Sequence, residues 1–106
     1  MAWTYLILAG LCEIVYAAML KLTEGFTKPL PTAIFFIAIV ASFILLARAA
    51  REIPIGTAYA VWSGVGVAGT AMVGILLYDE PATALRLLFL VMLLGSIVGL
   101  KLVTPT

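Results

Sequence analysis

The chain has 106 residues, of which 65% are apolar and only 10% are charged. Soluble domains are about 45–50% apolar and about 25% charged, so this composition, with a mean hydropathy of +1.27, excludes a soluble globular fold. A net charge of +1, a single cysteine and no histidine argue against a nucleic-acid partner, an intrachain disulfide, a metal site or a cofactor.

Apolar stretches of the length needed to cross a bilayer, about 20 residues each, occur four times along the chain. They predict an all-α membrane protein, a single four-helix transmembrane domain over residues 1–106 with helices at about 2–20, 31–50, 55–78 and 83–103. The first stretch lacks a basic leader and carries a glutamate, so we interpret it as a retained helix rather than a signal peptide. Charged residues, glycine and proline separate the stretches and predict loops.

Glu13 lies near the middle of the first predicted span, where an ionised carboxylate is costly and is normally retained for a pathway, a relay or a counter-ion role. No lysine or arginine is expected at the same depth, so a structural ion pair is the less favoured explanation. Small neighbours one turn away, Ala9, Gly10 and Ala17, predict a notch that admits a ligand. Hydrocarbon favours the neutral carboxyl group, so a cation would have to displace its proton, which is the minimum chemistry for proton-coupled antiport.

Side chains of the second and third spans are expected to complete this site. Ser42 lies midway along the second span, where its hydroxyl can bond the carboxylate or its own helix backbone. Tyr59, Trp62, Ser63 and Gly66 share one face of the third span. Aromatic rings stack on cations, and hydroxyls donate hydrogen bonds to carboxylates. The alternative is an interfacial aromatic belt, but Trp62 lies well inside the span, below the headgroups.

The fourth span contains Gly95 and Gly99, the spacing of a GxxxG motif at which membrane helices approach closely. We predict that this helix dimerises; packing within one chain is the alternative. Lys101, near the membrane edge, is expected to extend toward the headgroups.

Basic residues are balanced between the two ends of the predicted bundle. Three lie beside the second loop and the C-terminus and three at the opposite end: Arg48, Arg51 and Lys101 against Lys21, Lys28 and Arg86. This count gives the positive-inside rule little to act on, so insertion in both orientations and a slight bias to one orientation are both open. A four-helix bundle largely fills its own interior, so a substrate path would need a second copy.

Glu13, the loop 25–27, the run from Ile53 to Gly66 and the four-helix length resemble the small multidrug resistance family over the whole chain. Members of that family export small or lipophilic cations in exchange for protons and assemble as antiparallel homodimers of oppositely inserted copies. The resemblance implies that Glu13 binds substrate and proton in turn, that the aromatic pair of the third span lines the site, and that Ser42 orients the carboxylate.

The subtype is indicated by Gly10, the run 57–59 and Lys101, which look like the guanidinium exporters of that family. Two features depart from that subtype. Tyr16 stands where a tryptophan is usual, although its hydroxyl can still donate to the carboxylate, and the run 63–66 is closer to the multidrug subtype.

The expected function is therefore proton-coupled export of guanidinium or small substituted guanidinium cations across the bacterial inner membrane, with the substrate between two Glu13 carboxylates. A polyspecific exporter of quaternary ammonium compounds is the alternative within the family. A non-transporting membrane assembly subunit or chaperone is the alternative of another class, but it leaves Glu13, Tyr59 and Trp62 unexplained. No enzyme is expected, because the sequence has no nucleophile–base pair, metal cluster or phosphate loop.

Overall fold

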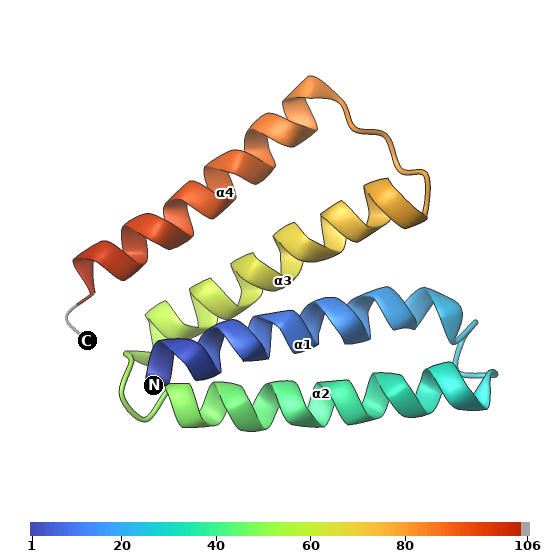
Figure 1. Cartoon of the computed structure of the whole chain (residues 1–106), viewed down its shortest axis with the longest axis horizontal. Coiled ribbons are helices and arrows are strands. Elements are labelled where there is room, and N and C mark those ends of the chain that lie inside the picture. The colour runs from blue at the N-terminus through green and yellow to red at the C-terminus, as the bar shows by residue number, and fades with distance from the viewer. Residues whose placement is uncertain (105–106) are drawn as a thin grey trace.

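The computed structural model describes residues 1–104. It contains four α-helices, α1 (Ala2–Leu22), α2 (Pro29–Ala49), α3 (Ile55–Leu77) and α4 (Ala84–Val103), drawn in Figure 1. Each is long and apolar enough to cross a membrane. The prediction of an all-α protein with four spanning helices is confirmed.

Three of the eight helix ends coincide with the predicted bounds, and the others differ by one or two residues. The largest differences lie at the first loop, where α1 continues to Leu22 and α2 already begins at Pro29. Pro29 and Pro31 predicted a loop, but both occupy the first turn of α2. A proline is tolerated there because the amide hydrogen that it lacks has no partner within the helix. Between the two helices, Gly25 adopts φ 74°, a left-handed conformation that favours glycine.

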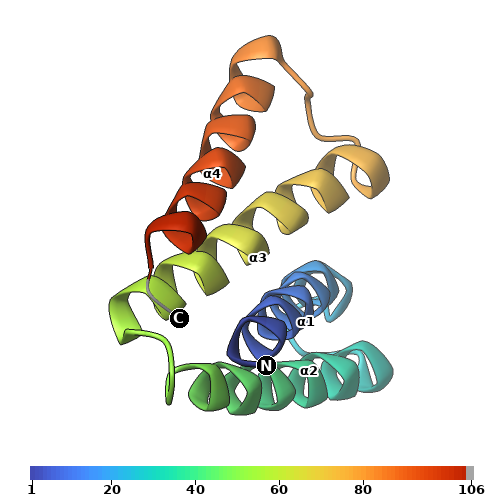
Figure 2. The ribbon, with the colours of Figure 1, turned by 60° about the vertical axis from the view of Figure 1, so that its left-hand side comes forward.

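Helix α1 lies between α2 and α3 and packs against both (Figures 1 and 2). The core is at the end of the bundle that holds the N-terminus and the α2–α3 turn. Its fully buried side chains include Leu6, Ala9, Ala49, Ile53 and Val61. This core joins the first three helices and fixes their register at the depth of the site described below.

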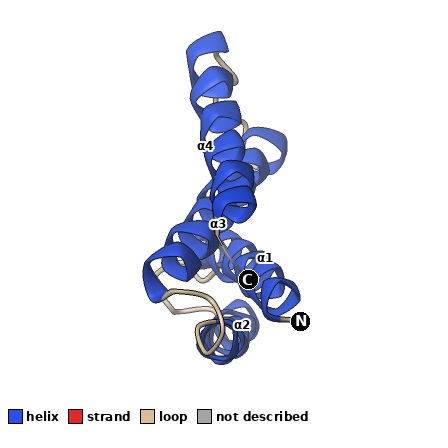
Figure 3. Ribbon diagram, turned by 90° about the vertical axis from the view of Figure 1, so that its left-hand side faces the viewer, coloured by secondary structure: helices blue, strands red, loops and turns tan. Residues whose placement is uncertain are grey.

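Helix α4 stands apart from the other three. Of the helices in the described part of the chain, only α3 approaches the α4 backbone, and no α4 residue is buried. In Figures 2 and 3, α4 approaches α3 near the α4 C-terminal end. The two helices diverge toward the other end, where the loop joins them. A membrane helix with one neighbour leaves most of its surface to lipid or to another chain.

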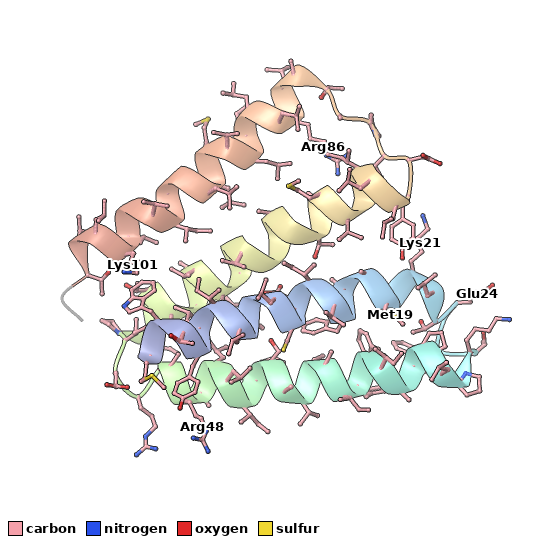
Figure 4. All side chains as sticks on the ribbon, viewed as in Figure 1. Met19, Lys21, Glu24, Arg48, Arg86 and Lys101 are labelled. Atoms are coloured by element: carbon pink, nitrogen blue, oxygen red, sulfur yellow. The ribbon has the colours of Figure 1, made fainter. Side chains whose placement is uncertain are left out.

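The basic residues divide between the two ends of the bundle as the connectivity predicts. In Figure 4, Arg48 and Lys101 lie at one end, whereas Lys21, Glu24 and Arg86 lie at the other. The Lys101 ammonium lies 5.4 Å from the centre of the Trp3 ring, which links the last turn of α4 to the start of α1 by a cation–π contact.

Candidate functional site

Glu13 faces α3 and is packed directly against Gly66. A Cβ atom built on Gly66 would overlap the Glu13 carboxyl group, so no side chain larger than hydrogen fits at position 66 without displacing it. One helical turn further along, Gly69 receives Ile14 in the same way. Glycines on α3 thus let α1 approach closely enough to hold the carboxyl group against the α3 backbone.

The Glu13 carboxyl group has no ion-pair partner in the described part of the chain. Its Oε1 atom is buried and has no hydrogen-bond partner among residues 1–104. The ion pairs in that part of the chain join Lys28 to Glu24 and Arg86 to Glu80, away from the membrane centre. A buried oxygen without a partner is costly, and such groups in native proteins call for a functional explanation. A proton or an organic cation would satisfy it.

Ser42 is fully buried and joins three helices through its hydroxyl group. Its Oγ atom donates a hydrogen bond to the Ala9 carbonyl oxygen at 2.8 Å and accepts one from Trp62 Nε1 at 2.9 Å. Ala9 is four residues before Glu13, so it belongs to the turn of α1 that directly precedes the carboxyl group. We call this chain of contacts, from Trp62 through Ser42 to Ala9, the Trp62–Ser42 relay.

The relay differs from the expected role of Ser42. The hydroxyl bonds the backbone of α1 rather than the Glu13 side chain, and it does not bond its own helix. A lone serine in a span predicts only that a hydrogen bond exists, because the partner depends on how the helices pack. In this arrangement Ser42 ties the turn of α1 that precedes Glu13 to α2.

The aromatic residues of α3 lie side by side but differ in exposure. Their ring centres are 5.4 Å apart, and Trp62 is 6% exposed whereas Tyr59 is 58% exposed. Phe43, on α2, also packs against Trp62, with ring centres 5.3 Å apart. Trp62 is thus held by both neighbours and by the relay, and Tyr59 presents its ring to the surroundings of the bundle.

Tyr16 and Ser63 are both partly buried. Tyr16 lies on α1, one turn after Glu13, and packs edge-on against Phe35 of α2 with ring centres 5.7 Å apart. Ser63 lies on α3 directly after Trp62. Glu13 and Tyr16 therefore lie one turn apart on α1, and the relay joins the preceding turn of α1 to α2 and α3.

The notch expected beside Glu13 is closed on one side. A Cβ atom on Gly10 would come within 2.6 Å of a Val65 methyl group, so α3 already fills that space. A cavity of about 220 Å³ lies between α1, α3 and α4, where Ile14, the residue after Glu13, forms part of its wall. Its walls are entirely apolar: Ile14, Val65, Ala68, Gly69, Met72, Leu90 and Leu94. Such walls offer no charge or hydrogen bond to a cation, so the polar chemistry stays with Glu13 and its neighbours.

Gly95 and Gly99 touch no other part of the described chain. A Cβ atom at either position would meet nothing within 4 Å. The neighbouring Ile97 points the other way and packs against Gly64 of α3. The intrachain role considered for the glycine pair is therefore absent from residues 1–104, and the pair lies on the outer face of α4.

Two contributors to the site were not predicted. The Ala9 carbonyl oxygen anchors the relay, and Phe43 supports the Trp62 ring. Every residue has a backbone carbonyl oxygen, so the sequence does not show which one accepts this hydrogen bond. Phe43 directly follows Ser42, but an apolar residue inside an apolar span carries no distinguishing signal.

Comparison with known proteins gives a consistent result. The family model described as Small Multidrug Resistance protein matches residues 1–93. A protein of Yersinia pseudotuberculosis is 48% identical over 102 residues, which cover 96% of this chain and 98% of that protein. A protein of Citrobacter freundii is 48% identical and one of Escherichia coli K12 is 46% identical, each over 104 residues covering 98% of this chain and 99% of the relative. All three are named Guanidinium exporter.

Proposed function

Because the chain belongs to the small multidrug resistance family, we propose that it exports guanidinium or small substituted guanidinium cations in exchange for protons. Its four apolar helices and its family make it a multi-pass protein of the inner membrane. The proposed activity moves a substrate without changing it, so the protein is not an enzyme.

The observation that carries this proposal is the Glu13 carboxyl group, buried against Gly66 with no partner for Oε1. A carboxyl group in this setting is stable when protonated or when paired with a cation. It cannot do both at once, so proton and substrate compete for one site. Substrate loading on one side and protonation on the other would then couple the two fluxes.

Guanidinium suits such a site chemically. The ion is planar, and two of its N–H groups can meet a carboxylate in parallel, as an arginine head does. Its faces can stack on aromatic rings, and the Trp62 and Tyr59 rings lie on the same face of α3. The Tyr16 hydroxyl, one turn from Glu13, can donate a further hydrogen bond to the carboxylate.

A second copy of the chain would complete the transport path. We propose an antiparallel homodimer of oppositely inserted copies, with the substrate between two Glu13 carboxylates. The exposed face of α4 with Gly95 and Gly99 and the balanced basic residues support this assembly. Two copies in opposite orientations would supply the symmetry that inverted repeats supply in larger transporters, and rocking of one against the other would give alternating access.

Export of quaternary ammonium compounds is the second candidate. It is favoured by the exposed Tyr59 ring and by the run Ser63–Gly66, which is closer to the multidrug subtype than to the guanidinium subtype. A quaternary ammonium ion has no N–H donors and gains mainly from apolar and aromatic contacts. The two substrate classes thus depend on different parts of the pocket.

The test is to reconstitute the protein in liposomes and record currents on solid-supported membranes during jumps of guanidinium, phenylguanidinium and tetrapropylammonium. Currents with the two guanidines alone are the expected result. Comparable currents with tetrapropylammonium would assign the polyspecific function. Silence with all three, from a protein that elutes as a single folded species, would contradict transport of either class.

A further inference from the structure

A second polar site lies at the end of the bundle, away from Glu13. It is an open groove of about 440 Å³ lined by Met1, Tyr5, Arg48, Arg51 and Glu52. The groove lies where α1 begins and α2 ends, so it falls at the level of the lipid headgroups rather than in the hydrocarbon. Its volume is within the range of about 300–1,000 Å³ that is typical of small-ligand sites.

The backbone that carries the two arginines is anchored to the core by hydrogen bonds and by buried neighbours. Arg48 is in the last turn of α2, and Arg51 follows it in a turn closed by hydrogen bonds from the Glu52 and Ile53 amides to the Ala49 carbonyl oxygen, at 3.1 and 3.0 Å. Ala49 and Ile53 are both in the core, with exposures of 0% and 1%. The guanidinium groups therefore extend from a fixed base, unlike those of a flexible basic loop.

Neither arginine has a carboxylate partner among residues 1–104, which distinguishes this end of the bundle from the other. Among residues 1–104, the two ion pairs neutralise Lys28 and Arg86 at the opposite end. Glu52 lines the groove but forms an ion pair with neither arginine, so the side chains of the groove carry one net positive charge. An arginine held at a headgroup surface without a partner is available to an external anion.

Helix ends add to this positive field. The N-termini of α1 and α3 both point to this end of the bundle, and neither has an acidic residue in its first turn or a side-chain cap. The C-terminus of α2 has the opposite sign, but Arg48 occupies its last turn and offsets it. Tyr5, partly buried at the wall of the groove, has the amphipathic ring that is favoured between headgroups and acyl chains.

We propose that this groove binds the phosphate headgroup of an anionic phospholipid, held in a forked hydrogen-bond arrangement by Arg48 and Arg51. Arginine forks match phosphate oxygens in pairs, which gives geometric specificity beyond simple attraction. The proposal does not depend on the transport activity, because lipid binding is measured directly. The competing explanation is that the arginines contribute only to a general attraction for an anionic surface.

The test is native mass spectrometry of the purified full-length protein, titrated with phosphatidylglycerol and with phosphatidylcholine of the same acyl chains. Phosphatidylglycerol should bind the wild type more tightly. The variant Arg48→Gln/Arg51→Gln should lose this affinity by about 25-fold, at about fivefold for each arginine. The matched control, Lys28→Gln/Arg86→Gln, lowers the net charge by the same amount at the other end and should keep it.

Glu52→Gln changes the same groove in the opposite direction, because it should raise the affinity for the lipid. Removal of the repelling carboxylate should strengthen phosphatidylglycerol binding, by up to about fivefold. If the double arginine variant does not fold, Arg51→Gln alone changes only an exposed residue of the turn and should cost about fivefold.

Three results would overturn the proposal. Equal losses in the groove variant and the control variant would mean general electrostatic attraction. Equal affinity for the two lipids would mean that the arginines do not select an anion. Displacement of the lipid by an equimolar amount of inorganic phosphate would mean that the groove takes a free anion rather than a lipid.

Discussion

Contact between the Glu13 carboxyl group and Gly66 is the feature on which the proposed chemistry depends at the scale of single residues. The glycine lets the carboxyl group lie against the α3 backbone, away from lipid. Any larger residue at position 66 would push the carboxyl group out of this place.

Gly66→Ala should therefore weaken guanidinium binding by about tenfold, a loss equivalent to roughly 1.4 kcal/mol. Overpacking should also lower the free energy of unfolding by about 1–3 kcal/mol. Gly56→Ala is the matched control, because a Cβ atom there meets open space on the same helix. Tryptophan fluorescence titration with guanidinium would measure binding in the two variants. Unchanged binding in Gly66→Ala would contradict the assigned contact.

Residues whose identity is unusual for a membrane span could be selected from the sequence. Glu13 stands out because ionisable groups are expensive in hydrocarbon, and Trp62 because it lies too deep for an interfacial belt. The partner of Ser42 could not be predicted, because a hydroxyl bonds whichever acceptor the packing brings near. In the structure that acceptor is the Ala9 carbonyl oxygen.

Three of the four helices are tied together at one depth by the Trp62–Ser42 relay. The relay connects α3 to α2 and α2 to the turn of α1 before Glu13. Loss of the relay should weaken the packing of these helices. The Glu13 carboxyl group should then also be held less firmly in its position.

A double-mutant cycle with Ser42→Ala and Trp62→Phe should reveal this coupling. Each single change breaks the same hydrogen bond, so the double variant should lose less stability than the sum of the two, by about 0.6–1.7 kcal/mol. The free energies are obtained from unfolding in mixed micelles. A control cycle with Ser96→Ala and Trp62→Phe should be additive, since the Ser96 hydroxyl bonds its own helix at Met92. Additivity in the first cycle would argue against the relay.

The number and placement of helices could be predicted from sequence because each span needs about 20 apolar residues between polar breaks. The start of α2 lies two residues before the predicted one. Proline breaks a helix in its interior, but in the first turn it removes only an amide hydrogen that has no partner within the helix. Helix tilts and the separation of α4 could not be predicted, because an apolar span carries little record of which face meets protein and which meets lipid.

At the scale of the whole molecule, α4 is the element that the single chain leaves without enough partners. None of its residues is buried, and the glycine pair lies opposite the Ile97 side that meets α3. This face is the surface that we assign to the second copy.

Replacement of both glycines, Gly95→Leu/Gly99→Leu, should weaken dimerisation by about tenfold or more while the helical content of each chain is unchanged. Energy transfer between labelled copies in liposomes would report the dimer, and circular dichroism would report the helices. Ser96→Leu adds one leucine side chain to the same helix, about 100° around the axis from Gly95 and about 60° from Gly99, and should weaken the dimer less than the glycine variant does. A wild-type dimer affinity in the glycine variant would place the interface elsewhere.

The most direct test of the account is proton flux through Glu13→Gln. Liposomes holding a pH-sensitive dye would receive an inward guanidinium gradient. We expect the wild type to move protons outward and raise the internal pH, and Glu13→Gln to fold with an unchanged unfolding midpoint but to show no flux. Proton flux driven by guanidinium in Glu13→Gln at the wild-type rate would contradict the account.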